Sequence, residues 1–170
     1  MDVCIIGIGN ELRGDDGVGP ALAARLQDGP LCGIAAVYNL GSDAFAVPGL
    51  VKEHRLNVII DSLPPGPEPG KVRIIPWQAR FMNAKNALSL HDLDLLWQLQ
   101  TVKGNGAKVW LAGIETASMS WGVGLSPLLI QNFALIVDDL TTKIRRLIEG
   151  ENDAPSSCHV IRGKDRMAVL

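Results

Sequence analysis

Two adjacent carboxylates, Asp15 and Asp16, stand on a glycine-rich turn that directly follows an apolar segment. A further acid, Asp61, ends the apolar run Val58–Ile60, and His91 lies where a helix is expected to begin. Two carboxylates and one imidazole would form a three-ligand metal site with an open position that faces a substrate. The nitrogen ligand suits zinc, iron or nickel better than calcium or magnesium.

Each of these residues also has an ordinary structural interpretation. One aspartate before a helix is enough to cap its free amides, so capping accounts for Asp15 or Asp16 but not for both. An aspartate at a strand end makes a turn as readily as it does chemistry. His91 fits an exposed helix position equally well, although the dipole at a helix start keeps the ring neutral and able to bind a metal. Convergence of three groups is what favours function.

The glycines of the turn also suggest a second chemistry, the binding of a dinucleotide. That motif needs Gly-x-Gly-x-x-Gly, and Leu12 stands where its third glycine belongs. The sequence has no Gly-Lys-Ser/Thr triplet for a triphosphate, no His-Glu-x-x-His helix of a zinc peptidase and no Gly-x-Ser-x-Gly elbow of a serine hydrolase. A nucleotide-dependent oxidoreductase is therefore a disfavoured alternative.

The elements that position these residues alternate between apolar strand-like runs and helix-like segments. This alternation predicts a single-domain α/β fold of three layers, in which helices cover both faces of a mostly parallel, twisted, five-stranded sheet. One antiparallel edge strand is expected, because residues 71–76 alternate charged and apolar side chains. The five strands are expected at residues 3–8, 33–40, 57–61, 71–76 and 107–114. Acids that follow parallel strands meet at the carboxyl edge of such a sheet, where ligands bind.

Proline, glycine and serine mark the boundaries of the other elements. A helix is expected over residues 20–26, and the proline-rich stretch Pro64–Gly70 is expected to be a rigid loop outside any strand. A long helix is predicted to begin with Ser126 as its N-cap and Pro127 as its first residue, and to end at Gly150.

The composition is that of an ordinary soluble protein, with 170 residues, 20% charged residues and a formal net charge of −2. Residues 1–150 are expected to form one domain and residues 151–170 a polar tail. The charge points to neither nucleic acid nor an anionic membrane, and no apolar run approaches the about 20 residues of a membrane span. The start has no basic leader, and the three cysteines form no Cys-x-x-Cys pair, so we expect a reducing, cytoplasmic location.

With these residues assembled, the sequence resembles the hydrogenase maturation endopeptidases, which remove a C-terminal extension from the large-subunit precursor of nickel-iron hydrogenases. The resemblance runs across most of the chain and rests on four matches in chain order. They are Gly7-x-Gly9-Asn10-x-Leu12-x-x-Asp15-Asp16-Gly17-x-Gly19, then Ile59-Ile60-Asp61, then Ser89-Leu90-His91, and finally Gly113-Ile114-Glu115 with Trp121-Gly122-x-Gly124-Leu125-Ser126.

This resemblance implies that Asp16, Asp61 and His91 bind the metal and carry the cleavage, with Asp15 as a neighbour and helix cap. It implies nickel that is supplied by the precursor, so that the free enzyme need not hold a metal. The implied partner is the precursor of a nickel-iron hydrogenase large subunit, which is cut after a basic residue, and we expect the protease to act as a monomer. Either the metal polarises the scissile carbonyl or one carboxylate activates the attacking water.

One segment departs from the family pattern. Where the family usually has Gly-Gly-Thr or Gly-Gly-Ser after the second strand, this chain has Leu40-Gly41-Ser42-Asp43, and we expect Asp43 to alter substrate contacts there. A second function also fits the same three ligands. It is a nickel-sensing chaperone or checkpoint protein that binds the loaded precursor without cutting it.

Overall fold

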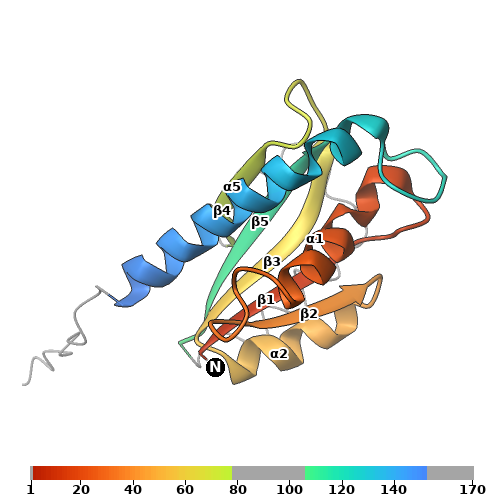
Figure 1. The fold of residues 1–170 in the computed structure, drawn as a ribbon. Helices are drawn as coiled ribbons and strands as arrows, with labels where there is room; N and C mark the ends of the chain where they lie inside the picture. Colours follow the sequence, from red (N-terminus) through yellow and green to blue (C-terminus); the bar gives the residue numbers. More distant parts are fainter. Residues whose placement is uncertain (1, 78–105, 153–170) are drawn as a thin grey trace, which may run out of the picture.

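The structure is a computed structural model that describes residues 2–77 and 106–152. Its centre is a five-stranded sheet with the strand order β2-β1-β3-β5-β4 (Figure 1). The strands are β1 (Val3–Ile8), β2 (Ala36–Gly41), β3 (Leu56–Pro65), β4 (Val72–Pro76) and β5 (Lys108–Thr116). Four strands are parallel, and β4 pairs antiparallel to β5 at one edge. This arrangement confirms the predicted sheet and its antiparallel edge strand.

Helices cover both faces of the sheet. They are α1 (Val18–Gln27), α2 (Val47–Glu53) and α5 (Pro127–Asn152), and two short 3-10 helices, η1 (Gly14–Gly17) and η2 (Ala44–Ala46), precede α1 and α2. Figure 1 shows α5 and α1 crossing the sheet, with α2 at its other side. One apolar cluster joins α1 and α5 to the sheet, and a second joins α2 to the opposite face. The three-layer α/β prediction is thus confirmed.

The first strand is buried along its whole length, as its unbroken apolar run predicts. Ile5 packs in the cluster beneath α1 and α5, whereas Ile6 packs in the cluster beneath α2, and both side chains are fully buried. Burying a side chain of this size stabilises a protein by about 1.5–3 kcal/mol. The turn that follows β1 therefore begins from a strand that is buried along its whole length.

Glycines bring α1 into direct contact with the main chain of the sheet. A Cβ atom on Gly19 would lie 2.2 Å from the carbonyl oxygen of Ile8 and 2.6 Å from that of Ile60. A Cβ atom on Gly7 would lie 2.4 Å from the carbonyl oxygen of Gly19. These two glycines serve close helix-to-sheet packing, and as a result η1 sits at the carboxyl end of β1.

Two predicted boundaries were wrong. The third strand continues to Pro65, so Pro64 and Pro65 belong to β3 and the loop begins only at Gly66. Pairing of β3 with β1 stops at Ile60, which leaves β5 as the neighbour of the last residues, and a register shift before Pro65 accommodates the missing N–H group. The second boundary is Gly150, which does not end α5. Its backbone is not left-handed, so the helix continues to Asn152.

The second strand also differs slightly from its predicted bounds, and two predictions concern residues that the structure does not describe. The strand β2 starts at Ala36 rather than at residue 33, because residues 31–35 form a hydrogen-bonded turn. The predicted helix start around His91 and the tail beyond residue 152 lie outside the described residues. Within residues 2–77 and 106–152, none of the helices has the length and apolar character that crossing a membrane requires.

Candidate active site

The two acids expected to bind metal lie at the same edge of the sheet. Asp16 is part of η1, just beyond the end of β1, and Asp61 lies in the neighbouring strand β3. The last paired residues of these two strands are Gly7 and Ile60, so Asp61 is the first residue of β3 past its pairing with β1. Both carboxylates are half-buried. The edge in question is the carboxyl edge of four parallel strands, as the sequence predicts.

Ser62 connects the two carboxylates. Its hydroxyl Oγ donates to Asp16 Oδ1 at 2.6 Å, and its main-chain N–H donates to Asp61 Oδ1 at 2.7 Å. The second oxygen of Asp16 accepts a bond of 3.2 Å from the main-chain N–H of Asn10. One residue therefore lies within hydrogen-bonding distance of both acids, and Asp16 is held through both of its oxygens. Sequence reasoning missed Ser62, because a serine after an aspartate carries no signal of its own.

Asp15 has a different environment from its neighbour. It is fully buried, and its carboxylate accepts three main-chain hydrogen bonds, from the N–H groups of Ala117 at 2.9 Å, Ser118 at 3.0 Å and Ser126 at 2.6 Å. No side-chain bond caps η1 or α1. Asp15 thus does not cap the helix that follows it. It fastens the segment between β5 and α5, more than 100 residues further along the chain.

The loop between β5 and α5 lies against the turn that carries the acids, as the teal and red segments of Figure 1 show. Gly14 donates to the carbonyl of Gly122 at 2.9 Å, and Gly122 donates to the carbonyl of Leu12 at 3.0 Å. The guanidinium of Arg13 stands 5.7 Å from the ring centroid of Trp121, within cation–π range. These contacts give the loop a defined position beside the acids.

Large apolar side chains project into solvent from this loop and its surroundings. Trp121 is 79% exposed, Val123 is 86% exposed and Leu12 is 57% exposed. Leu12 belongs to the turn that holds Asp16, and the other two come from the loop paired with that turn. We call Leu12, Trp121 and Val123 the apolar rim. Adjacent exposed apolar side chains of this size are typical of protein interaction sites.

The departure at residues 40–43 lies next to the same strand end. Gly9 donates to the carbonyl of Gly41 at 2.8 Å, and the hydroxyl of Ser42 lies 3.4 Å from the carbonyl oxygen of Gly9. Asp43 is exposed, and Phe45, two residues on, is 77% exposed. The effect of Asp43 on substrate contacts stays a prediction.

His91 lies outside the described residues, so the third expected ligand stays a prediction as well. In the described part of the chain, no three His, Cys, Asp or Glu side chains gather closely enough to hold a metal ion. The donor set of Asp16 and Asp61 fits a cation that takes oxygen ligands and requires at least one more ligand from elsewhere.

Glu115 lies near the carboxyl end of β5, at the same edge of the sheet. Its buried carboxylate accepts a bond of 2.8 Å from Arg73 of β4 and another from the main-chain N–H of Glu68. Arg73 and the Glu68 amide hold the pKa of Glu115 below its ordinary value, even though desolvation opposes them. The carboxylate also leaves room only for a glycine at residue 66, where a Cβ atom would lie 2.4 Å from it. Glu115 therefore fixes the loop that follows β3.

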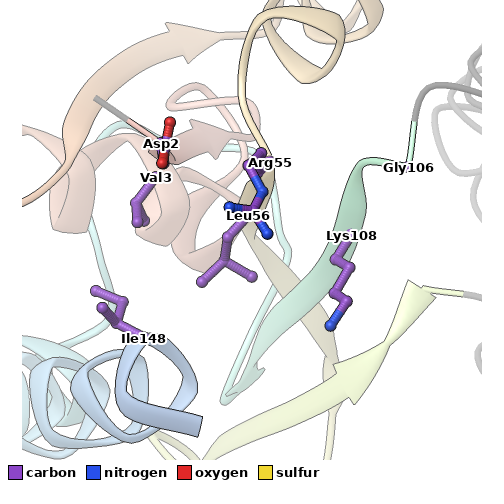
Figure 2. A pocket seen from close by; sticks show the side chains of 7 residues that line it. All are labelled: Asp2, Val3, Arg55, Leu56, Gly106, Lys108 and Ile148. Atoms are coloured by element: carbon purple, nitrogen blue, oxygen red, sulfur yellow. The ribbon is translucent and has the colours of Figure 1, made fainter. Parts of the chain in front are cut away.

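A pocket lies at the opposite end of the sheet and contains none of the predicted site residues (Figure 2). Its lining comes from the amino ends of β1, β3 and β5 and from the last turns of α5. The lining residues are Asp2, Val3, Arg55, Leu56, Gly106, Lys108 and Ile148. Because ligands of parallel α/β sheets bind at the carboxyl edge, this pocket is not the candidate active site.

The same fold occurs in solved structures of several hydrogenase maturation enzymes. The hydrogenase maturating endopeptidase HybD from E. coli superposes with a TM-score of 0.71 and 20% identity, over 86% of this chain and 93% of that chain. The [NiFe] hydrogenase maturation protease HybD from Thermococcus kodakarensis gives a TM-score of 0.67 and 23% identity, over 84% of this chain and 98% of that chain. The [NiFe] hydrogenase maturation protease HycI from the same organism gives a TM-score of 0.61 and 22% identity, over 86% of this chain and 92% of that chain.

These structures define the fold as that of hydrogenase maturation proteases. The chain belongs to the hydrogenase maturation protease family, since the family model of that description, HycI, matches residues 20–143. The matched range contains Asp61 but begins after Asp16. The assignment of Asp16 therefore depends on the opening motif of the sequence and on its place in η1. No curated protein matches the sequence.

Proposed function

We propose that this protein is an endopeptidase that recognises nickel in the precursor of a nickel-iron hydrogenase large subunit and removes its C-terminal extension. Asp16, Asp61 and His91 complete the coordination of the precursor's nickel. The observation that carries the proposal is the pair of hydrogen bonds from Ser62, one to the carboxylate of Asp16 and one to that of Asp61, at the carboxyl edge of the sheet. Membership of the protease family supports the hydrolytic part of the proposal.

Nickel enters this reaction as part of the substrate. Once bound by the two carboxylates, it holds the adjacent scissile bond against the enzyme, and positioning of this kind can supply a large part of a rate enhancement. Two ways of activating the bond remain, namely polarisation of the carbonyl by the metal and activation of water by one carboxylate. Both need the same geometry, in which Asp16 and Asp61 reach a common atom.

The apolar rim supports a folded protein as the substrate. Leu12 belongs to the turn that carries Asp16, and Trp121 and Val123 belong to the loop paired with that turn. An aromatic residue held by a cation is a rigid contact point that loses little entropy on binding. We place the reaction in the cytoplasm, as a monomer, and the free thiols of Cys4 and Cys32 support a reducing compartment.

The proposal is tested with a purified precursor in nickel-loaded and nickel-free forms. Wild-type protein is expected to shorten only the loaded form, and the product mass gives the bond that is cut. Asp16→Ala, Asp61→Ala and His91→Ala are each expected to abolish the cut while the proteins stay folded. Asp28→Asn, which changes an exposed aspartate at the end of α1, serves as the matched control and is expected to cut normally.

The non-proteolytic alternative predicts a different result in the same assay. A nickel-sensing chaperone would form a stable complex with the loaded precursor and leave its mass unchanged. Cleavage by the Asp16→Ala or His91→Ala protein at the wild-type rate would contradict the ligand assignment.

A further inference from the structure

The hydroxyl group of Ser62 is buried and has a single described use. The residue is 6% exposed, and its Oγ donates to Asp16 Oδ1 at 2.6 Å. A buried hydroxyl without a partner costs about 1–3 kcal/mol, and among the described residues Asp16 is the partner that satisfies this one. The position therefore requires an explanation in terms of Asp16.

Successive side chains of β3 point to opposite faces of the sheet. Ile60 and Ser62 face the side of the sheet covered by α1, because alternate residues of a strand share a face. The side chain of Asp61 faces the other side, next to Ile59 and Leu63. Asp16 approaches from η1, on the side of Ser62. The hydroxyl thus reaches across to Asp16 while the amide of the same residue holds Asp61.

Two carboxylates at one strand edge repel each other unless donors or a cation stand between them. Ser62 supplies a donor to each of them, and the amide of Asn10 supplies another to Asp16. A carboxylate offers about four lone-pair sites, and the described bonds of Asp16 use one on each oxygen. Capacity for a cation therefore remains after Asp16 has been oriented.

We propose that Ser62 is a positioning residue that sets the orientation of Asp16 relative to Asp61 for binding the nickel of the precursor. The inference rests on the proposed function and goes beyond it, because Ser62 is not among the three proposed ligands and acts through Asp16. Groups that orient metal ligands in this way typically change metal affinity or activity by about 10–100-fold when they are removed.

The test uses Ser62→Ala, Ser62→Thr and the control Thr116→Val in the full-length protein. Thr116 is fully buried at the end of β5, and its hydroxyl donates to the carbonyl of Leu63 at 2.9 Å, one residue beyond Ser62. Its replacement removes a hydrogen bond that steadies the same part of β3 but touches neither carboxylate. Ser62→Thr keeps the hydroxyl and is the conservative rescue.

Three quantities are measured for each variant, namely kcat/KM for the nickel-loaded precursor, Kd for the nickel-free precursor, and Tm. Ser62→Ala is expected to lower kcat/KM by about 10–100-fold. Its Kd for the uncut nickel-free precursor should stay at the wild-type value, since that form has no nickel for Asp16 to bind. Ser62→Thr should recover most of the lost rate, and Thr116→Val should keep kcat/KM near that of the wild type.

A general loosening of the strand would instead lower kcat/KM in Thr116→Val as much as in Ser62→Ala, and that result overturns the inference. Wild-type kcat/KM in Ser62→Ala also overturns it. Should the wild-type protein not cut the loaded precursor, the proposed function fails, and crystal structures then decide the inference separately. An Asp16 carboxylate that keeps its place in Ser62→Ala rejects the positioning role, and one that turns away upholds it.

Discussion

At the scale of single residues, the acid pair shows how one turn divides two identical side chains between structure and chemistry. Asp15 is fully buried, and its carboxylate accepts hydrogen bonds from three main-chain N–H groups. Asp16 is half-buried, and its carboxylate is oriented by one hydroxyl and one main-chain amide. We therefore assign Asp15 to the architecture of the site and Asp16 to its chemistry.

This division predicts opposite results for the same substitution. Asp15→Asn replaces one accepting oxygen with an NH2 group that faces N–H donors, so at least one amide of Ala117, Ser118 or Ser126 loses its acceptor. Each buried amide left without an acceptor should lower the free energy of unfolding by about 1–3 kcal/mol, as measured by urea denaturation. Asp16→Asn, the matched control, should change the free energy of unfolding little but stop processing of the precursor. Equal stability of the two variants would contradict the assignment.

At the scale of elements, the loop between β5 and α5 is what the acid turn holds in place. Asp15 bonds to both of its ends, Gly14 and Gly122 pair in its middle, and Arg13 stacks on Trp121. The loop therefore keeps a fixed shape without being covered by other elements. A fixed and exposed apolar segment loses little conformational freedom when a partner binds.

The apolar rim is expected to contribute to binding of the precursor in both its nickel-loaded and its nickel-free forms. Trp121→Ala should raise the Kd for the precursor by about tenfold or more, because exposed tryptophans at the centre of an interface often contribute 1–2 kcal/mol or more. Binding is measured by calorimetry with the nickel-free precursor, which is not cut. Leu135→Ala changes an apolar side chain on α5 that is 68% exposed, and it should leave the Kd unchanged. A wild-type Kd in Trp121→Ala would remove the rim from the interface.

The ion pair between Glu115 and Arg73 links β5 to β4 and predicts a pH dependence of stability. The pKa of Glu115 is lower in the folded protein than its ordinary value of 4.5. Its contribution to stability is therefore fully present above about pH 4.5 and is lost as the pH falls from there through the folded-state pKa. Glu115→Gln should thus lower the free energy of unfolding near pH 7, and the difference from the wild type should shrink towards pH 3.

The measurement for this prediction is urea denaturation of both proteins across that pH range. Glu149→Gln changes an exposed carboxylate on α5 and should give a smaller difference near pH 7. A stability difference that stays constant between pH 7 and pH 3 would show that the charge of Glu115 is not what stabilises the edge.

At the scale of the whole molecule, the close contact between α1 and the sheet depends on glycines, Gly19 in the helix and Gly7 in β1. Gly19→Ala would place a Cβ atom 2.2 Å from the carbonyl oxygen of Ile8 and 2.6 Å from that of Ile60, so α1 must move away from the sheet. Overpacking of this kind costs about 1–3 kcal/mol and occasionally more. In a chain of this size, each kcal/mol lowers Tm by about 2–4 °C, and thermal denaturation measures the shift.

Gly49→Ala is the matched control for that substitution. Gly49 lies within α2, and a Cβ atom there would have nothing within 4 Å, so the change should raise helix stability by about 0.5–1 kcal/mol. If Gly19→Ala raises Tm as Gly49→Ala does, the packing explanation of the opening glycines is wrong. Because η1 ends directly before α1, Gly19→Ala should also displace Asp16 and reduce processing.

Local patterns in the sequence were enough to predict the sheet, its antiparallel edge and the position of Asp16 and Asp61 at the carboxyl edge. Buried parallel strands are continuous apolar runs, and the carboxyl ends of such strands meet at one edge, so neither inference needs knowledge of distant contacts. The errors fall where tertiary pairing overrides local chemistry. Pro65 remains in β3 because β1 no longer pairs with that part of the strand, so no N–H group is needed on that side. Gly150 remains in α5 because its backbone does not adopt the left-handed conformation that ends a helix.

Tertiary structure alone decided which partner each polar group takes. Asp15 binds Ser126, which is 111 residues away in the chain, and Ser62 reaches Asp16 across 46 residues. A hydrogen bond needs its two atoms within about 3 Å, and that distance depends on the packing of α1 on the sheet rather than on the residues beside either partner. The sequence therefore determined at which edge of the sheet the carboxylates would lie, and the packed fold decided that Asp15 would fasten a loop while Ser62 would hydrogen-bond to both Asp16 and Asp61.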